Sequence, residues 1–153
     1  MKDLSKYTGK KFIDGSADCY GLIREFYKNE FGIELKDYAR YYGWWEEGKN
    51  LYMDNFRNEG FYLLDDTEES QYGDVFLIAL GCSVASHGAI YVGENKILHH
   101  VQDRLSSIDR YMGVFRNCTL ARLRHKQVAE ERKKEYEFDD RVIETLTGNM
   151  RQI

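Results

Sequence analysis

The spacing of apolar side chains predicts an amphipathic α-helix over positions 18–31. Apolar residues recur there at steps of three and four, which places them on one helix face: Leu22, Ile23, Phe26, Tyr27 and Phe31. Asp18 is a residue type that caps the beginning of a helix, and Gly32 is typical of its end. Cys19 stands three positions before Leu22, so we expect the thiol on the buried face.

Farther along, the pattern changes to the short apolar runs of β-strands. The ranges expected to form strands are 61–64, 74–80, 87–92, 96–101, 112–115 and 119–123. The first of these is expected at a sheet edge, and 93–96 has the composition of a hairpin turn. A short helix is expected over 51–56. One helix followed by an antiparallel meander predicts the α+β class rather than a parallel βαβ arrangement.

The composition becomes strongly charged after position 125. Good helix formers with charges of both signs, as in 130–135, predict an exposed helix followed by a tail. We therefore divide the chain into a domain at 1–125 and a charged helical C-terminal tail at 126–153. A solvated helix that docks on the domain is one interpretation of the tail, and a helix that binds a partner is the other.

Length, composition and charge favour one folded domain. The chain has 153 residues, 42% of them hydrophobic, which suffices for a core and argues against disorder. A net charge of −4, without a basic stripe, argues against a nucleic-acid-binding protein. No apolar run approaches the length of a membrane span, and the first residues lack the apolar core of a signal peptide. We expect a protein made in the cytoplasm without a signal peptide.

The three cysteines, Cys19, Cys82 and Cys118, cannot all form intramolecular disulfides, so at least one thiol stays free. A reduced compartment during synthesis is the simplest reading. No cysteine or histidine pair has the short spacing of zinc ligands, so no metal is expected. Cys82 and Cys118 are interpreted as structural.

Cys19 carries the strongest chemical signal. A thiol at the N-terminus of a helix meets the positive end of the helix dipole, which favours the thiolate. A histidine beside it could take the proton and later protonate a leaving amine, and His87, at the beginning of a predicted strand, is the candidate. The alternative is a buried cysteine that acts as a small hydrophobe and a strand-end histidine near solvent.

His99 and His100 are candidates for a third residue that orients His87. Neighbouring residues on a strand point to opposite faces, so only one of the two can join the site. His99 shares its face with Ile97 and Val101. If that face lies toward the predicted helix, His99 is the orienting residue and His100 is peripheral.

Aromatic residues crowd positions 38–45, where five of eight residues are Tyr or Trp. Such a block fits either a place in the core or the wall of a groove for a polymer other than nucleic acid. The interspersed polar residues indicate a surface loop.

Three motifs in order resemble the NlpC-type cell-wall cysteine peptidases, and in particular the phage branch of that family. They lie at 18–24, at 72–75 leading into 86–93, and at 97–100. The likeness extends over about residues 8–126 and leaves the tail out. The resemblance implies a papain-like minimal cysteine peptidase fold, in which an N-terminal nucleophile helix packs on an antiparallel sheet.

The resemblance also implies the roles of the catalytic residues. Cys19 would be the nucleophile, His87 the general base and acid, and His99 the residue that orients His87. Backbone amides at the helix start, including that of Cys19, would bind the oxyanion. No metal or organic cofactor is expected.

Family enzymes cut the stem peptides of peptidoglycan, typically between D-glutamate and the following diamino acid. Asp18, Tyr20 and Ser86 are expected to contact the substrate. In many cellular members a serine follows the cysteine, and this serine and the preceding aspartate help to hold the free amine of the stem peptide. Tyr20 stands at that serine position here, which leaves the preferred peptide open.

The phage branch implies a place at the virion tail tip, with other tail-tip proteins as partners. There the enzyme would open the cell wall locally during genome entry, or act while the tail is assembled. The alternative is a structural plug or assembly factor that keeps the fold with little hydrolysis. The presence of Cys19, His87 and His99 favours retained chemistry.

Overall fold

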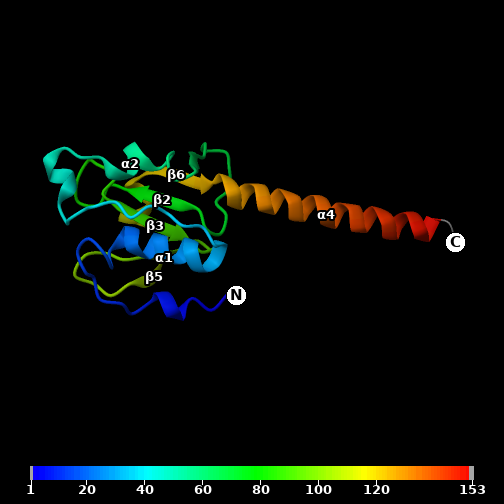
Figure 1. Ribbon diagram of the computed structural model, residues 1–153, viewed down its shortest axis with the longest axis horizontal. Helices are drawn as coiled ribbons and strands as arrows, with labels where there is room; N and C mark the ends of the chain where they lie inside the picture. The colour runs from blue at the N-terminus through cyan, green and yellow to red at the C-terminus, as the bar shows by residue number, and fades with distance from the viewer. Residues whose placement is uncertain (1, 152–153) are drawn as a thin grey trace.

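The computed structural model describes residues 2–151, and its centre is a six-stranded antiparallel sheet (Figure 1). The strands are β1 (Phe61–Leu63), β2 (Val75–Ile78), β3 (His87–Tyr91), β4 (Lys96–His99), β5 (Ser107–Arg110) and β6 (Thr119–His125). Their order across the sheet is β1-β6-β2-β3-β4-β5, so β1 lies at one edge, as predicted, and β5 at the other. Met1 and the last two positions of the predicted tail lie outside the described residues.

Helix α1 (Cys19–Phe31) begins and ends as predicted. The Asp18 carboxylate accepts the backbone N–H of Gly21 at 2.8 Å, which satisfies one of the free amides of the first turn. Gly32 closes the helix in the left-handed region, with φ of 66°. Gly21 also lets the preceding loop come close, since a Cβ there would lie 1.8 Å from the carbonyl oxygen of Ser16. These contacts fix the start of the helix, where Cys19 lies.

The sheet carries a packed core on each face. On one face, the buried side of α1 contacts an apolar cluster that includes Val75, Leu77, Ile90 and Leu98. On the opposite face a second cluster is formed by Phe76, Ile78, Ala89 and Ile97. All four residues of β2 are therefore buried, which explains the uniformly apolar run in the sequence. The α+β class and the helix packed on an antiparallel sheet are confirmed.

One predicted strand is wrong. The range 112–115 contains no strand; helix α3 (Val114–Asn117) covers its second half, and the strand of this region is β5, at Ser107–Arg110. Met112 and Val114 are exposed, so their apolar character does not reflect burial in a sheet. Strand β5 pairs with β4 at the edge, and its residues are half-buried or exposed, so it lacks the apolar alternation that marks a strand.

Between α1 and β1 the chain forms two short helical segments, η2 (Trp44–Glu47) and α2 (Leu51–Asn55). Helix α2 confirms the short helix expected over 51–56. Trp44 from η2 and Tyr52 from α2 line a pocket together with Cys19. This segment therefore adds the wall that faces the start of α1.

The beginning of the chain is fastened to the connection between β4 and β5. It contains the short helix η1 (Ser5–Tyr7). The Ser106 hydroxyl donates to the Tyr7 carbonyl at 2.7 Å, and the Ser106 N–H donates to the Lys10 carbonyl at 2.9 Å. The N–H of Gly9 returns to the Ser106 carbonyl at 2.8 Å. Residues far apart in the sequence thus close the domain.

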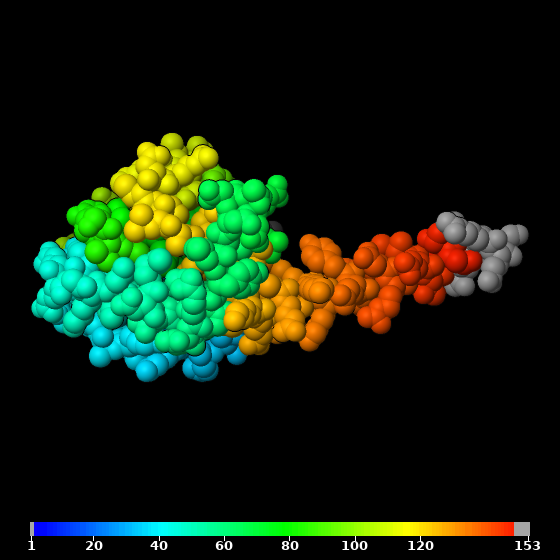
Figure 2. Space-filling model, turned by 90° about the horizontal axis from the view of Figure 1, so that it is seen from above, coloured from blue at the N-terminus to red at the C-terminus, as the bar shows by residue number. Residues whose placement is uncertain are grey.

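Strand β6 runs directly into α4 (Lys126–Arg151), a 26-residue helix that projects away from the domain (Figures 1 and 2). Its beginning packs on the domain, where Val128 is buried. Farther along, several large apolar side chains are exposed: Tyr136, Phe138, Val142, Ile143 and Leu146. The sequence predicted a helix followed by a tail, whereas the helix continues to Arg151. Among residues 2–151, no helix combines the length and the apolar character that crossing a bilayer requires.

Candidate active site

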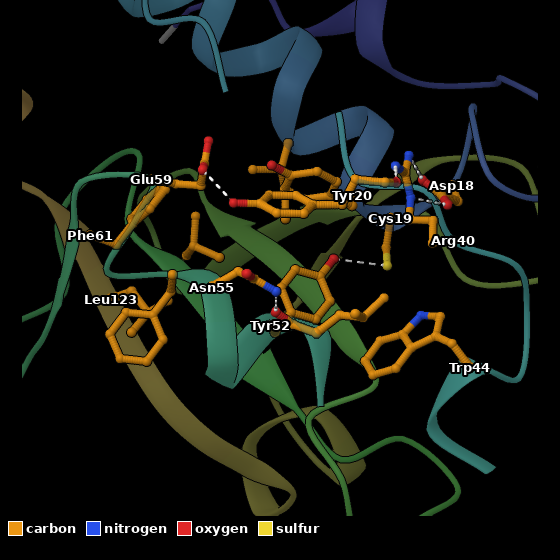
Figure 3. A pocket seen from close by; sticks show the side chains of 15 residues that line it. Asp18, Cys19, Tyr20, Arg40, Trp44, Tyr52, Asn55, Glu59, Phe61 and Leu123 are labelled. Atoms are coloured by element: carbon orange, nitrogen blue, oxygen red, sulfur yellow. Dashed lines mark hydrogen bonds and ion pairs between the residues drawn. The ribbon is translucent and has the colours of Figure 1, made fainter. Parts of the chain in front are cut away.

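Cys19 is the first residue of α1, and its thiol is hydrogen-bonded to the hydroxyl of Tyr52 on α2 (Figure 3). The distance between Cys19 Sγ and Tyr52 Oη is 3.1 Å. Burial raises the pKa of Tyr52 well above its ordinary value, so the phenol keeps its proton at neutral pH. A neutral hydrogen-bond donor therefore lies directly beside the thiol.

Two hollows share Cys19 as part of their lining. The first, which we call the tyrosine pocket, lies between α1, α2 and the β1–β6 edge of the sheet and includes Tyr20, Tyr38, Tyr52, Phe61 and Leu123 (Figure 3). The second, which we call the histidine groove, includes Ser86, His87, His100, Tyr41, Tyr42, Trp44 and Trp45. The aromatic block at 38–45 thus forms the wall of a groove beside the thiol.

His87 and His99 are brought together by the register of the sheet. His99 on β4 lies opposite Ala89 on β3, and His87 is two residues before Ala89, so the two imidazoles are diagonal neighbours on one face. His87 Nε2 and His99 Nδ1 are 2.9 Å apart, and both side chains are buried. This face is the one that carries Ile97, away from α1, whereas Leu98 packs toward α1. His99 was expected to orient His87 if its face of the strand lay toward α1, and that condition is not met. His99 nevertheless contacts His87, because both side chains point to the same face of the sheet.

His100, the residue after the end of β4, points elsewhere. Its Nε2 lies 3.1 Å from the carbonyl oxygen of Arg104, and its ring packs edge-on against Phe12. It lines the histidine groove without bonding to His87. Of the two candidates, His99 and not His100 is therefore the histidine that is hydrogen-bonded to His87.

The resting thiol and imidazole are both uncharged at neutral pH. Burial raises the pKa of the Cys19 thiol, and the nearby Asp18 carboxylate raises it further, while Tyr52 and the backbone N–H of Gly88 act in the opposite direction. Burial lowers the pKa of His87 to about 3. The expectation of a resting thiolate, which rested on the helix dipole, does not hold because burial of the thiol has the larger effect.

Asp18 is held by Arg40 in a buried, two-pronged ion pair (Figure 3). Arg40 Nε lies 2.7 Å from one carboxylate oxygen and Nη2 lies 2.8 Å from the other. The guanidinium also stacks over the Tyr20 ring, whose hydroxyl donates to the Lys36 carbonyl at 2.6 Å. Ser86, the remaining residue expected to bind substrate, bonds to the backbone of Leu80. Asp18, Tyr20 and Ser86 thus line the two hollows, but the polar group of each already forms hydrogen bonds within the protein.

Comparison with known proteins agrees with this architecture. A model of the NlpC/P60 family matches residues 6–132, which is most of the chain. The chain belongs to the NlpC/P60 family.

Two curated relatives of this NlpC/P60 chain carry the name tail tip assembly protein K. The protein of Escherichia phage lambda is 40% identical over 119 residues, and that of Escherichia phage N15 is 33% identical over 122 residues. Each match covers 78% of this chain, but it covers 59% of the lambda protein and 49% of the N15 protein. The chain therefore spans about half the length of these relatives.

A solved structure with the same fold is a lipoprotein-like NLP/P60 protein of Staphylococcus aureus subsp. aureus Mu50. The TM-score is 0.54 at 21% sequence identity, and the match covers 78% of this chain and 38% of that chain. At this identity the likeness establishes the fold alone. The papain-like arrangement predicted from the NlpC/P60 resemblance is confirmed.

Three residues of the site were not found from the sequence: Arg40, Tyr52 and Asp109. Arg40 and Tyr52 belong to the segment between α1 and β1, which has no clear periodicity, and Asp109 lies on the edge strand that the apolar pattern did not reveal. Asp109 Oδ2 is 2.7 Å from His99 Nε2. Across residues 2–151, no three or more His, Cys, Asp or Glu side chains are grouped as metal ligands.

Proposed function

We propose that this NlpC/P60 chain is a cysteine peptidase that hydrolyses the stem peptides of peptidoglycan through an acyl-enzyme at Cys19. The observation that carries the proposal is the placement of Cys19 and His87 in the lining of one groove, with His87 hydrogen-bonded to His99. A thiol, a base and an orienting residue are the groups that such catalysis needs.

The first half of the reaction forms a thioester. Sγ of Cys19 attacks the carbonyl carbon of the scissile amide while its proton passes to His87, and the oxyanion is held by the Cys19 backbone N–H and the Tyr52 hydroxyl. The tetrahedral intermediate then expels the amine, which takes its proton from His87. The neutral resting pair suits this order, because proton transfer occurs during attack rather than before it.

The second half releases the product. His87 takes a proton from water as the water oxygen attacks the thioester, and the thiolate leaves with a proton returned by His87. The products are an amine and a carboxylic acid, and neither step needs a metal or an organic cofactor. The tyrosine pocket and the histidine groove offer binding space for side chains of the peptide near Cys19.

We propose a place at a phage tail tip, because the relatives named above are tail tip assembly proteins. The partners would then be other tail-tip proteins and the stem peptide. The chain would be carried in the virion to the cell wall. In this proposal residues 1–125 form the peptidase domain and 126–153 an appended segment.

The relatives' name also supports a second candidate, a plug or assembly factor with little hydrolysis. The helix α4, which projects with exposed apolar side chains, is compatible with this role (Figure 2).

Digestion of purified sacculi separates the two candidates. The peptidase proposal expects the wild-type chain to release stem-peptide fragments, identified by mass spectrometry, and Cys19→Ala to release none. Cys118→Ala is the matched control, since this cysteine lies outside both hollows. Equal release by the wild type and Cys19→Ala would reject the peptidase, and a folded wild type that releases nothing would favour the plug.

A further inference from the structure

We propose that Asp109 is a positioning residue of the site, which acts through His99 to determine which nitrogen of His87 is free to accept the thiol proton. This inference deepens the proposed function, because it takes His87 as the base. It adds a fourth member to the Cys19, His87 and His99 set.

Asp109 reaches His99 across the sheet edge. Strands β4 and β5 pair so that His99 lies opposite Ser107, and Asp109 is two residues farther along β5. Asp109 Oδ2 lies 2.7 Å from His99 Nε2, and the Ser107 hydroxyl donates to the same oxygen at 2.9 Å. The His99 side chain is fully buried, while that of Asp109 is 48% exposed. The carboxylate thus connects a buried imidazole to the surface.

The charge of Asp109 determines the tautomer of His99. The hydrogen bond from His99 lowers the pKa of Asp109, so the group is an ionised carboxylate at neutral pH, which accepts hydrogen bonds and donates none. His99 Nε2 must therefore carry the hydrogen. Burial lowers the pKa of His99, so its ring is neutral and holds a single N–H. His99 Nδ1 is left with a free electron pair.

The tautomer of His99 in turn determines that of His87. The 2.9 Å contact between His99 Nδ1 and His87 Nε2 needs one hydrogen, and His99 Nδ1 has none to give, so His87 Nε2 donates. The His87 ring is neutral as well, so its hydrogen is on Nε2 and its electron pair is on Nδ1. Nδ1 is then the nitrogen that can accept a proton from Cys19.

Packing around the two imidazole rings restricts their reorientation. Phe115 packs edge-on against His99, with ring centroids 4.8 Å apart and planes at 87°, and both imidazoles are buried. Without a carboxylate at position 109, the other His99 tautomer becomes available. Its Nδ1–H would donate to His87 Nε2, and the His87 hydrogen would move to Nδ1, where it blocks proton transfer from the thiol.

Nitrogen-15 NMR of histidine-labelled protein tests the tautomers directly. We expect the wild type to show His87 and His99 each protonated at Nε2 and free at Nδ1. In Asp109→Asn, a measurable fraction of both rings should change to the Nδ1–H form. A change in stability alone would not move the hydrogen from Nε2 to Nδ1 in these rings. Identical ring-nitrogen shifts in the two proteins would overturn the proposal.

The rate of Cys19 alkylation by iodoacetamide at pH 7 gives a second readout. Asparagine in place of a buried triad aspartate lowers kcat by about 10⁴-fold in a serine protease. Because Asp109 is half exposed and asparagine can still accept, we expect a decrease of about 10- to 100-fold for Asp109→Asn. Asp109→Glu should restore most of the rate. An unchanged rate in Asp109→Asn would also overturn the proposal.

Two control variants complete the alkylation experiment. Ser107→Ala removes one hydrogen bond to the same carboxylate oxygen but leaves the bond to His99, and should lower the rate by a smaller factor than Asp109→Asn does. Asp139→Asn, on the exposed part of α4, should leave it unchanged. Both readouts are independent of hydrolysis: a wild type that fails to cut sacculi would reject the peptidase but leave the role of Asp109 to these measurements.

Discussion

The hydroxyl of Tyr52 lies 3.1 Å from Sγ of Cys19, which makes a residue of α2 part of the surroundings of the thiol. The same hydroxyl also lies close to the backbone of Gly88: a Cβ added at Gly88 would be only 2.7 Å from it. Tyr52 thus lies between Cys19 and the strand that begins with His87. In the proposed reaction this is where negative charge develops on the carbonyl oxygen.

Tyr52→Phe should slow hydrolysis with a smaller effect on KM. A missing oxyanion donor typically lowers kcat by about 10²- to 10³-fold, and the remaining Cys19 amide should reduce the loss here to about 10- to 100-fold. Steady-state kinetics on a stem peptide measure the change. Tyr111→Phe, which removes a hydroxyl bonded to Thr119 in another part of the fold, is the control. A Tyr52→Phe enzyme with wild-type kcat would exclude this role.

Gly88→Ala should destabilise the fold, because the added methyl would meet Tyr52 Oη at 2.7 Å and Ile23 Cδ1 at 2.8 Å. Overpacking of this kind costs about 1–3 kcal/mol in free energy of unfolding. Gly148→Ala on α4 is the matched control, since no atom lies within 4 Å of its Cβ and alanine favours helix by about 1 kcal/mol. Urea unfolding compares the variants. Equal midpoints for Gly88→Ala and the wild type would show that the site has room to spare.

Arg40→Met should be more destabilising than the loss of a surface charge. It would leave the Asp18 carboxylate buried without its partner, and breaking a buried pair in this way costs about 3–5 kcal/mol. Arg40→Lys keeps the charge but cannot reproduce both contacts, so its stability should be intermediate. Arg141→Gln on the exposed face of α4 serves as the control. The thermal midpoint should be highest for Arg141→Gln, lower for Arg40→Lys and lowest for Arg40→Met. Any other order would contradict a stabilising role of the Arg40–Asp18 ion pair.

His87 should make stability depend on pH below neutrality. The unfolded chain takes up the proton of this histidine near pH 6.5, the folded chain only near pH 3, so between these values the unfolded state binds more protons. Stability is therefore lost as pH falls from 7 toward 3. In His87→Gln the slope of unfolding free energy against pH should decrease by up to one proton, about 1.4 kcal/mol per pH unit. Identical slopes would mean that His87 takes up its proton at the same pH in the folded and the unfolded chain, contrary to the effect of burial.

Most of the framework could be predicted from the sequence because burial leaves a periodic trace. The apolar residues of α1 recur at helical spacing, and the central strands, buried on both faces, are continuous apolar runs, so Cys19, His87 and His99 were placed on the right elements. Strand β5 is an exposed edge and leaves no such trace, which hid Asp109. The contacts of Arg40 and Tyr52 join residues distant in sequence, and nothing local to either residue indicates its partner.

The pairing of Ser106 with the beginning of the chain has a consequence for synthesis. Tyr7 and Lys10 are synthesised before Ser106, so they find their hydrogen-bond partner only after the β4–β5 connection has been made. Contacts of such large sequence separation form late, because the loop must close before they stabilise anything. Cys19 is translated before His87 and His99, so a partly synthesised chain carries the thiol without the histidine proposed as its base. The catalysis proposed for Cys19 therefore becomes possible only after both histidines have been made.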